Sequence, residues 1–172
     1  MIETERLRLR RARPGDYDAS YTMWSDPRVT EFIGGLPSTR QQTWMRLLGG
    51  IGHWTALPYG PLVVEEAATG TFVGEVGLFH FKRDIAPSID EFPEAGWVCS
   101  PAMQGRGYAT EAMQGVLQWA DATLEAPRIV AIISEANVAS IRVAEKIGFR
   151  ECARTTFNGL PVLLFERVRT RS

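Results

Sequence analysis

Hydrophobic and polar residues alternate near the start of the chain, and this period of two predicts a half-buried strand there. Leu7 and Leu9 alternate with three arginines, which we interpret as one solvated face rather than as an anion site. The run of apolar residues at 129–133 has no polar face, which indicates a central strand. Including the first, strands are predicted at residues 7–10, 62–66, 72–81, 94–100, 128–134, 150–157 and 161–169.

Segments with helical periodicity lie between these strands. A short helix is expected from Pro14 onward, and a second helix follows a capping box formed by Ser38 and Gln41. A long amphipathic helix begins just past Gly107, and a further helix covers residues 137–147. The predicted order β-α-α-β-β-β-α-β-α-β-β describes a mixed sheet with helices on its faces.

Composition narrows the class of protein. The 172 residues, 45% of them hydrophobic, fit one domain spanning residues 1–172. A net charge of −1 argues against nucleic acid or an anionic membrane as the main partner. Cys99 and Cys152 lack the spacing of a disulfide framework or a zinc site, so no metal is expected. The charged N-terminus and the lack of a long apolar run predict a soluble, cytoplasmic protein.

The most informative segment is residues 98–110, which read VCSPAMQGRGYAT. A strand ends there, a glycine-containing loop follows, and a helix begins, so free backbone N–H groups and the positive end of the helix dipole favour a phosphate. A Walker loop is excluded because its lysine is missing. The dinucleotide fingerprint is weakened because Thr110 replaces its third glycine and the acidic Glu125 lies before the next strand. Acyl-CoA is the third class of ligand that suits this loop.

Two segments resemble the hallmark motifs of the GNAT family of N-acetyltransferases. Residues 104–109, QGRGYA, resemble the family's Q/R-x-x-G-x-G/A pyrophosphate motif, and residues 137–149, NVASIRVAEKIGF, resemble N-x-x-S followed by E-K-x-G-F. Further segments near residues 4–10, 25–27, 74–77 and 94–97 resemble the Rim-type branch, which contains ribosomal-protein N-terminal acetyltransferases. The resemblance implies an α+β fold with a mixed, largely antiparallel seven-stranded sheet, splayed after its fourth strand and carrying helices on both faces.

The resemblance also implies acetyl-CoA as the co-substrate and assigns residues to it. Backbone groups of the fourth strand would pair with the pantetheine arm, the loop would hold the pyrophosphate, and Asn137 would reach the pantetheine from the other side. Asn137 fits equally well as a helix N-cap, and the two roles are compatible. The implied cofactor-binding residues are Trp97, Val98, Cys99, Gln104, Gly105, Arg106, Gly107, Tyr108, Ala109, Thr110 and Asn137.

For catalysis the resemblance points to Glu94 as the general base, with Glu75 on the neighbouring strand as the rival and water as a possible intermediary. A backbone N–H near Val98 is the expected oxyanion donor. Many family members protonate the leaving thiol with a tyrosine that this chain lacks between residues 155 and 165, so Ser140 is the replacement. Since a thiol with a pKa near ~8.5 leaves tolerably well unaided, losing Ser140 is expected to cost little.

The sequence therefore predicts an acetyl-CoA-dependent N-acetyltransferase acting by direct attack of a primary amine on the thioester. The acceptor is either a protein N-terminal α-amine or a small-molecule amine, and Asp84, Asp90 and Glu91 are placed to attract a cationic one. The alternative is a non-catalytic acyl-CoA-binding module that acts as a sensor or partner protein, and a dinucleotide oxidoreductase ranks third. A monomer or homodimer without nucleic-acid or membrane partners is expected.

Overall fold

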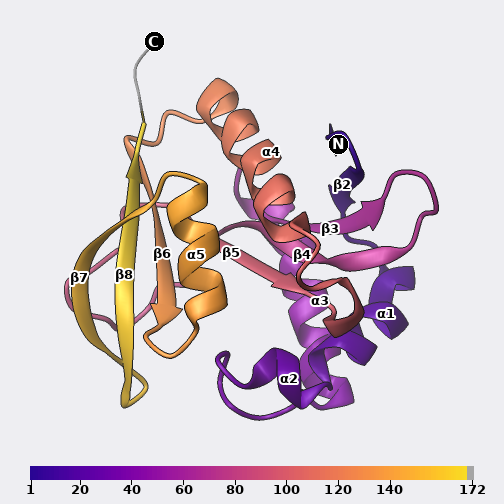
Figure 1. The fold of residues 1–172 in the computed structure, drawn as a ribbon, viewed down its shortest axis with the longest axis horizontal. Coiled ribbons are helices and arrows are strands. Elements are labelled where there is room, and N and C mark those ends of the chain that lie inside the picture. The colour runs from indigo at the N-terminus through magenta and orange to yellow at the C-terminus, as the bar shows by residue number, and fades with distance from the viewer. Residues whose placement is uncertain (170–172) are drawn as a thin grey trace.

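The computed structural model describes residues 1–169, which build a single sheet of eight strands (Figure 1). The strands are β1 (Ile2–Glu3), β2 (Leu7–Arg11), β3 (Pro61–Glu66), β4 (Phe72–Phe79), β5 (Glu94–Cys99), β6 (Arg128–Ser134), β7 (Arg150–Phe157) and β8 (Leu160–Val168). Their order is β1-β2-β3-β4-β5-β6-β8-β7, and every neighbouring pair is antiparallel except β5 and β6. The mixed, largely antiparallel sheet is confirmed. The expected count of seven strands is wrong, because β1 is too short to show a sequence period.

The four predicted helices are present, and the short α2 (Pro27–Thr30) is an additional helix that the sequence pattern did not predict. The others are α1 (Tyr17–Trp24), α3 (Arg40–Ala56), α4 (Tyr108–Thr123) and α5 (Val138–Lys146), with 3-10 turns η1 (Pro14–Asp16) and η2 (Pro101–Met103). The capping box of α3 uses Thr39 and Gln42 rather than Ser38 and Gln41. Both pairs satisfy the same sequence pattern, and Ser38 instead donates its N–H to the Trp24 carbonyl at 2.9 Å.

Helices cover both faces of the sheet, as predicted. The buried stripe of α4 packs on one face within the main hydrophobic core, and α5 lies beside it in front of the sheet in Figure 1. A second core cluster, formed by Met23, Trp24 and Val29 of α1 and α2, packs against Val98 on the opposite face. Because successive side chains of a strand point to opposite faces, Trp97 and Cys99 of β5 pack with the α4 side.

The sheet opens between β5 and β6, its two parallel strands. Within residues 1–169 their register contains one pair, Glu94 with Val130. Beyond that point β5 stays paired with β4 as far as Cys99, while β6 pairs with β8 as far as Ser134. The two strands diverge in Figure 1. The predicted splay after the fourth sequence-predicted strand, now β5, is therefore confirmed, and it leaves one edge of β5 open.

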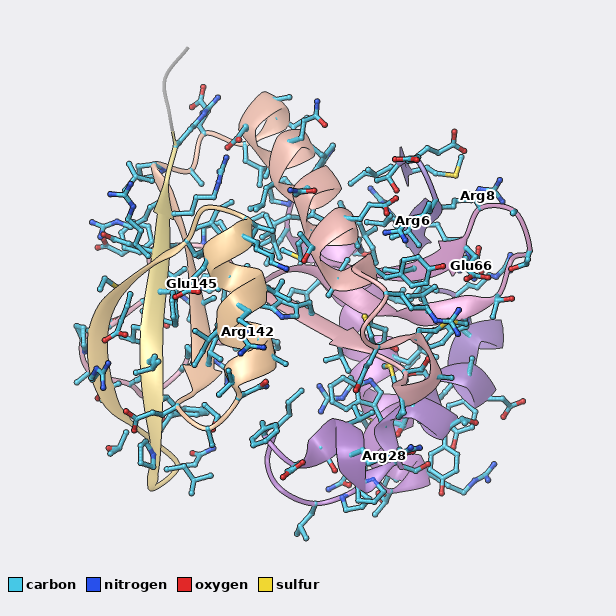
Figure 2. The ribbon with its side chains drawn as sticks, in the orientation of Figure 1. Arg6, Arg8, Arg28, Glu66, Arg142 and Glu145 are labelled. Carbon is cyan, nitrogen blue, oxygen red and sulfur yellow. The ribbon has the colours of Figure 1, made fainter. Side chains whose placement is uncertain are left out.

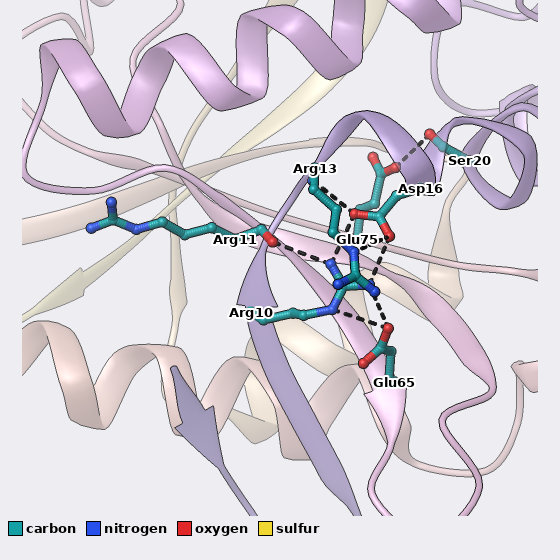
Figure 3. Close-up of polar contacts among 7 residues, drawn as sticks. All are labelled: Arg10, Arg11, Arg13, Asp16, Ser20, Glu65 and Glu75. Atoms are coloured by element: carbon teal, nitrogen blue, oxygen red, sulfur yellow. Dashed lines mark hydrogen bonds and ion pairs between the residues drawn. The ribbon is translucent and has the colours of Figure 1, made fainter.

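The arginines of β2 are more than a solvated face. The guanidinium of Arg10 donates to Asp16 at 2.7 and 2.8 Å and to Glu65 at 3.0 Å, which joins η1 to β2 and β3 (Figure 3). Burial acts to raise the pKa of Asp16, but hydrogen bonds from Arg10 and from the Arg13 N–H outweigh it and lower that pKa. The interpretation as a solvated face is wrong for Arg10, because Asp16 of the following turn and Glu65 of β3 fold against it.

Candidate active site

The loop after β5 presents backbone N–H groups at the start of α4. Gly105 and Gly107 have φ angles of +74° and +79°, in the left-handed region that favours glycine. A Cβ at Gly105 would meet nothing within 4 Å, so the loop is open on that side. Gly107 is the N-cap of α4 and offers no side-chain cap, and Glu111 is the first helix residue whose N–H bonds back to Gly107. No acceptor among residues 1–169 takes the N–H groups of Tyr108, Ala109 or Thr110.

Arg6 holds this loop in place from the N-terminal segment. Its Nε donates to Glu111 Oε2 at 2.7 Å, its Nη1 donates to the Arg106 carbonyl at 3.1 Å, and its guanidinium stacks 4.7 Å from the centre of the Tyr108 ring. Burial acts to raise the pKa of Glu111, but hydrogen bonds from Thr4 and Arg6 outweigh it and lower that pKa. Sequence reasoning missed Arg6, because no local signal connects positions 105 residues apart.

Some side chains of the loop bind the rest of the fold, and others face solvent. The Tyr108 hydroxyl donates to Glu66 Oε1 at 2.6 Å, and this hydrogen bond raises the pKa of Tyr108. The Arg106 guanidinium is half exposed, with Nη1 3.9 Å from the same Glu66 oxygen. Arg6 and Glu66 lie on the same side of α4 in Figure 2. Gln104 donates from Nε2 to the Cys99 carbonyl at 3.2 Å. Tyr108 therefore offers a ligand its backbone N–H, whereas Arg106 also presents its charge.

The second predicted motif begins α5. The Asn137 side chain accepts the Ser140 N–H at 3.1 Å, which confirms the N-cap and leaves the Asn137 amide N–H₂ free for a ligand. Ser140 lies half buried in the first turn of α5. Since β5 and β6 are parallel and each is followed by its helix, both helix N-termini lie at the same end of the splay. The fold thus brings the two motifs to one site.

The two candidate carboxylates lie on neighbouring strands, four positions apart in the register. Glu94, only 7% exposed, starts the strand, and Arg83 binds both of its oxygens at 2.6 and 2.7 Å. Glu75 of β4 is directly opposite Val98, four residues further along β5. It is half buried, and it accepts the Ser20 hydroxyl at 2.6 Å (Figure 3) and the Trp24 Nε1–H at 3.0 Å. Glu94 and Glu75 therefore offer different sites for a proton acceptor.

Comparison with known proteins identifies the family. The family model described as "Acetyltransferase (GNAT) domain" matches residues 6–150. The chain belongs to the GNAT acetyltransferase family. It is therefore an acetyltransferase.

Its relatives agree with this assignment. A GNAT-family acetyltransferase from Bordetella pertussis is 35% identical, with a TM-score of 0.85 over 97% of this chain and 98% of that one. The Bacillus subtilis N-acetyltransferase YnaD is 28% identical over 87% of this chain and 82% of its own. A spermidine N-acetyltransferase from Vibrio cholerae, solved with CoA and spermine, shares the fold at 19% identity, with a TM-score of 0.76 over 96% and 97% of the two chains.

An acetyltransferase can pass the acetyl group directly to the acceptor or first to a cysteine, and the second route requires a reactive thiol. Burial raises the pKa of Cys99 to about 11, and burial also raises the pKa of Cys152. A thiol with such a pKa is almost fully protonated near neutral pH and is a poor nucleophile. Cys99 is therefore poorly suited to form an acetyl-cysteine on β5.

Over residues 1–169, no helix combines the length and the apolar character needed to cross a bilayer.

Proposed function

We propose that this GNAT protein transfers the acetyl group of acetyl-CoA to a primary amine by direct attack of the amine on the thioester. The observation that carries the proposal is the splay beside β5, which ends at a glycine loop with unpaired N–H groups. A pyrophosphate fits a helix N-terminus of this kind, because the N–H groups and the helix dipole both favour negative charge. CoA in the Vibrio cholerae relative of the same fold is consistent with acetyl-CoA as the donor.

Each part of acetyl-CoA has suitable groups in this chain. The loop from Gln104 to Thr110 offers backbone N–H groups and the Arg106 charge to the pyrophosphate. The open edge of β5, at Trp97, Val98 and Cys99, suits the amides of the pantetheine arm as an added strand would. The Asn137 amide, at the N-terminus of α5, belongs to the same end of the splay.

In this proposal Glu75 is the general base. A backbone N–H near Val98 on the open edge of β5 is the expected oxyanion donor, and Glu75 lies directly opposite Val98 in the strand register. Glu75 is half exposed and receives hydrogen bonds from neutral groups, while Glu94 is buried with both oxygens on Arg83. The sequence alone ranks Glu94 first as the general base. Because Glu75 is the more accessible carboxylate, we rank it first instead. A base is needed because an unperturbed lysine-type amine has a pKa of about 10.4 and is protonated near neutral pH.

Ser140→Ala is expected to keep the acetyl-CoA affinity and to lower kcat by less than about 10-fold, since a thiol with a pKa near ~8.5 is a competent leaving group. Stopped-flow measurement of CoA release separates kcat from binding. A loss beyond about 100-fold would make Ser140 an essential acid and would contradict the leaving-group argument.

Asn137→Asp is expected to keep the melting temperature of the wild type but to weaken acetyl-CoA binding by about 5- to 100-fold. An aspartate caps α5 as well as asparagine does, but it cannot donate the amide hydrogen bond, which is worth about 1–3 kcal/mol. Calorimetric titration and thermal melts measure the two effects separately. Equal affinity of wild type and variant would reduce Asn137 to a helix cap.

The test of the proposed function is amine-dependent release of CoA. The protein is incubated with acetyl-CoA and a panel of N-terminal peptides, polyamines, aminoglycosides and amino acids, and free thiol is measured over time. The proposal predicts release that depends on at least one amine class. Tight acetyl-CoA binding without release for any amine would overturn it in favour of a non-catalytic acyl-CoA-binding module.

A further inference from the structure

Arg46 of α3 lies over the indole ring of Trp24, with its Cζ atom 3.9 Å from the ring centre. Its side chain is open to solvent, and across residues 1–169 no carboxylate or carbonyl pairs with it. It adjoins the buried face of α3, because Thr43 and Gly50, three residues before it and four after, are both buried. Arg46 therefore stands at the rim where α3 meets α1.

Arg46 is exposed, and protein lies against one side of its guanidinium. Desolvation by the neighbouring protein lowers the pKa of Arg46, although the charge of Glu75 acts in the opposite direction. The more buried guanidiniums of Arg10, Arg83 and Arg167 are each held by carboxylates. Arg46 has no such partner among residues 1–169, although one face of its guanidinium lies on the Trp24 ring. Its donors are therefore free to bind an anionic ligand.

Trp24 connects this cation to the proposed base. Arg46 covers the face of the indole, and the indole Nε1–H donates to Glu75 at 3.0 Å. Glu75 lies opposite Val98, whose side chain packs on the cluster that contains Trp24. Arg46 and Glu75 therefore flank one residue beneath the part of β5 where the thioester carbonyl is proposed to lie.

We infer that the acceptor is an amine that also carries a carboxylate, such as a free amino acid, with Arg46 binding the carboxylate and Glu75 facing the amine. This inference rests on the proposed function and deepens it. A guanidinium presents two parallel N–H donors that match the two oxygens of a carboxylate. A polyamine has no group for Arg46, and its added positive charge would be repelled there.

The loop that suggested a cationic acceptor lies elsewhere. Its residue Arg83 pairs with Glu94 at the start of β5, and the Asp90 carbonyl contacts the His80 ring nitrogen at 2.9 Å. Glu94 is four residues away from Val98 along the strand. The acidic side chains of this loop therefore belong to the opposite end of β5 from Arg46.

The test uses matched acceptors that differ at one group. Each amino acid is compared with its carboxamide and with the amine that lacks the carboxyl carbon, and phosphoethanolamine is compared with β-alanine. The wild type is expected to show a KM about 10- to 100-fold lower for the carboxylate member of a pair, the usual range for a charged hydrogen-bonded contact. Preference for phosphoethanolamine over β-alanine would overturn the assignment of a carboxylate.

Substitutions at Arg46 then assign the preference to its side chain. Arg46→Met is expected to raise the KM of the amino acid to that of its carboxamide and to leave the KM of the carboxamide and the acetyl-CoA affinity unchanged. Arg46→Lys should recover part of the preference, because it keeps the charge without the planar fork. Arg40→Met is the matched control, since Arg40 lies on the same helix over the Tyr17 and Tyr21 rings.

The outcomes separate the inference from the function on which it rests. If carboxamides and simple amines are acetylated as well as amino acids are, the inference fails and the acetyltransferase proposal stands. If Arg46→Met lowers kcat equally for both members of a pair and lowers the melting temperature, Arg46 is structural and the inference fails. If acetyl-CoA binds and no amine in either panel is acetylated, the proposed function itself fails.

Discussion

Gly107→Asp is expected to lower the affinity for acetyl-CoA by at least about 100-fold, equivalent to about 2.7 kcal/mol. The new carboxylate would stand at the N-cap of α4, where it accepts the free N–H groups that the pyrophosphate is proposed to use. It also brings a negative charge to the place where phosphates bind. Isothermal titration calorimetry measures the loss directly.

The control for this variant is Gly159→Asp. Gly159 has a φ of +78°, close to the +79° of Gly107, and a Cβ there would meet nothing within 4 Å. It lies in the turn between β7 and β8, so it tests the backbone strain and the added charge without touching the loop. Similar melting temperatures with a loss of affinity confined to Gly107→Asp are expected. Unchanged affinity in a folded Gly107→Asp variant would place the cofactor elsewhere.

Glu75→Gln is expected to lower kcat by about 100-fold or more near neutral pH, the usual range for loss of a general base. The deficit should shrink as the pH rises, because a larger share of the acceptor amine is then already neutral. Acetyl-CoA affinity should not change, since Glu75 faces α1 rather than the loop. Rate measurements across pH with a saturating acceptor provide the test.

Glu94→Gln is the comparison variant. It removes one charge from the pair with Arg83 and is expected to lower stability more than it lowers kcat, because Arg83 is left with an incomplete partner. If Glu94→Gln instead loses kcat by about 100-fold while Glu75→Gln stays active, the base is Glu94, as the sequence alone ranks it.

Patterns carried by consecutive residues predicted much of the fold. The apolar run that ends at Ile133 and has no polar face is buried in β6, between β5 and β8. Gly148 adopts the expected left-handed φ of +89° after α5. The Asn158-Gly159 turn has both φ angles positive, as its sequence requires. The errors arose where no repeating pattern exists, as in the two-residue β1, or where two patterns overlap, as at Thr39.

The residues of the candidate site likewise fall into those that the sequence could predict and those that it could not. Gly107 and Asn137 were identifiable because each helix start is encoded by neighbouring residues. The contacts Arg6–Glu111, Arg83–Glu94 and Arg46–Trp24 depend on how separate elements pack, which no spacing in the sequence reveals. Ion pairs of this kind follow from strand register and helix placement, so they became visible only in the structure.

The central claim is transfer of an acetyl group from acetyl-CoA to an amine, and isotope labelling tests it most directly. The protein is incubated with acetyl-CoA labelled in the acetyl carbonyl, together with an acceptor found in the amine panel, and the products are analysed by NMR and mass spectrometry. The label is expected in an amide bond of the acceptor, in an amount equal to the CoA released. Label recovered only as free acetate, or attached to the protein at Cys99, would contradict it.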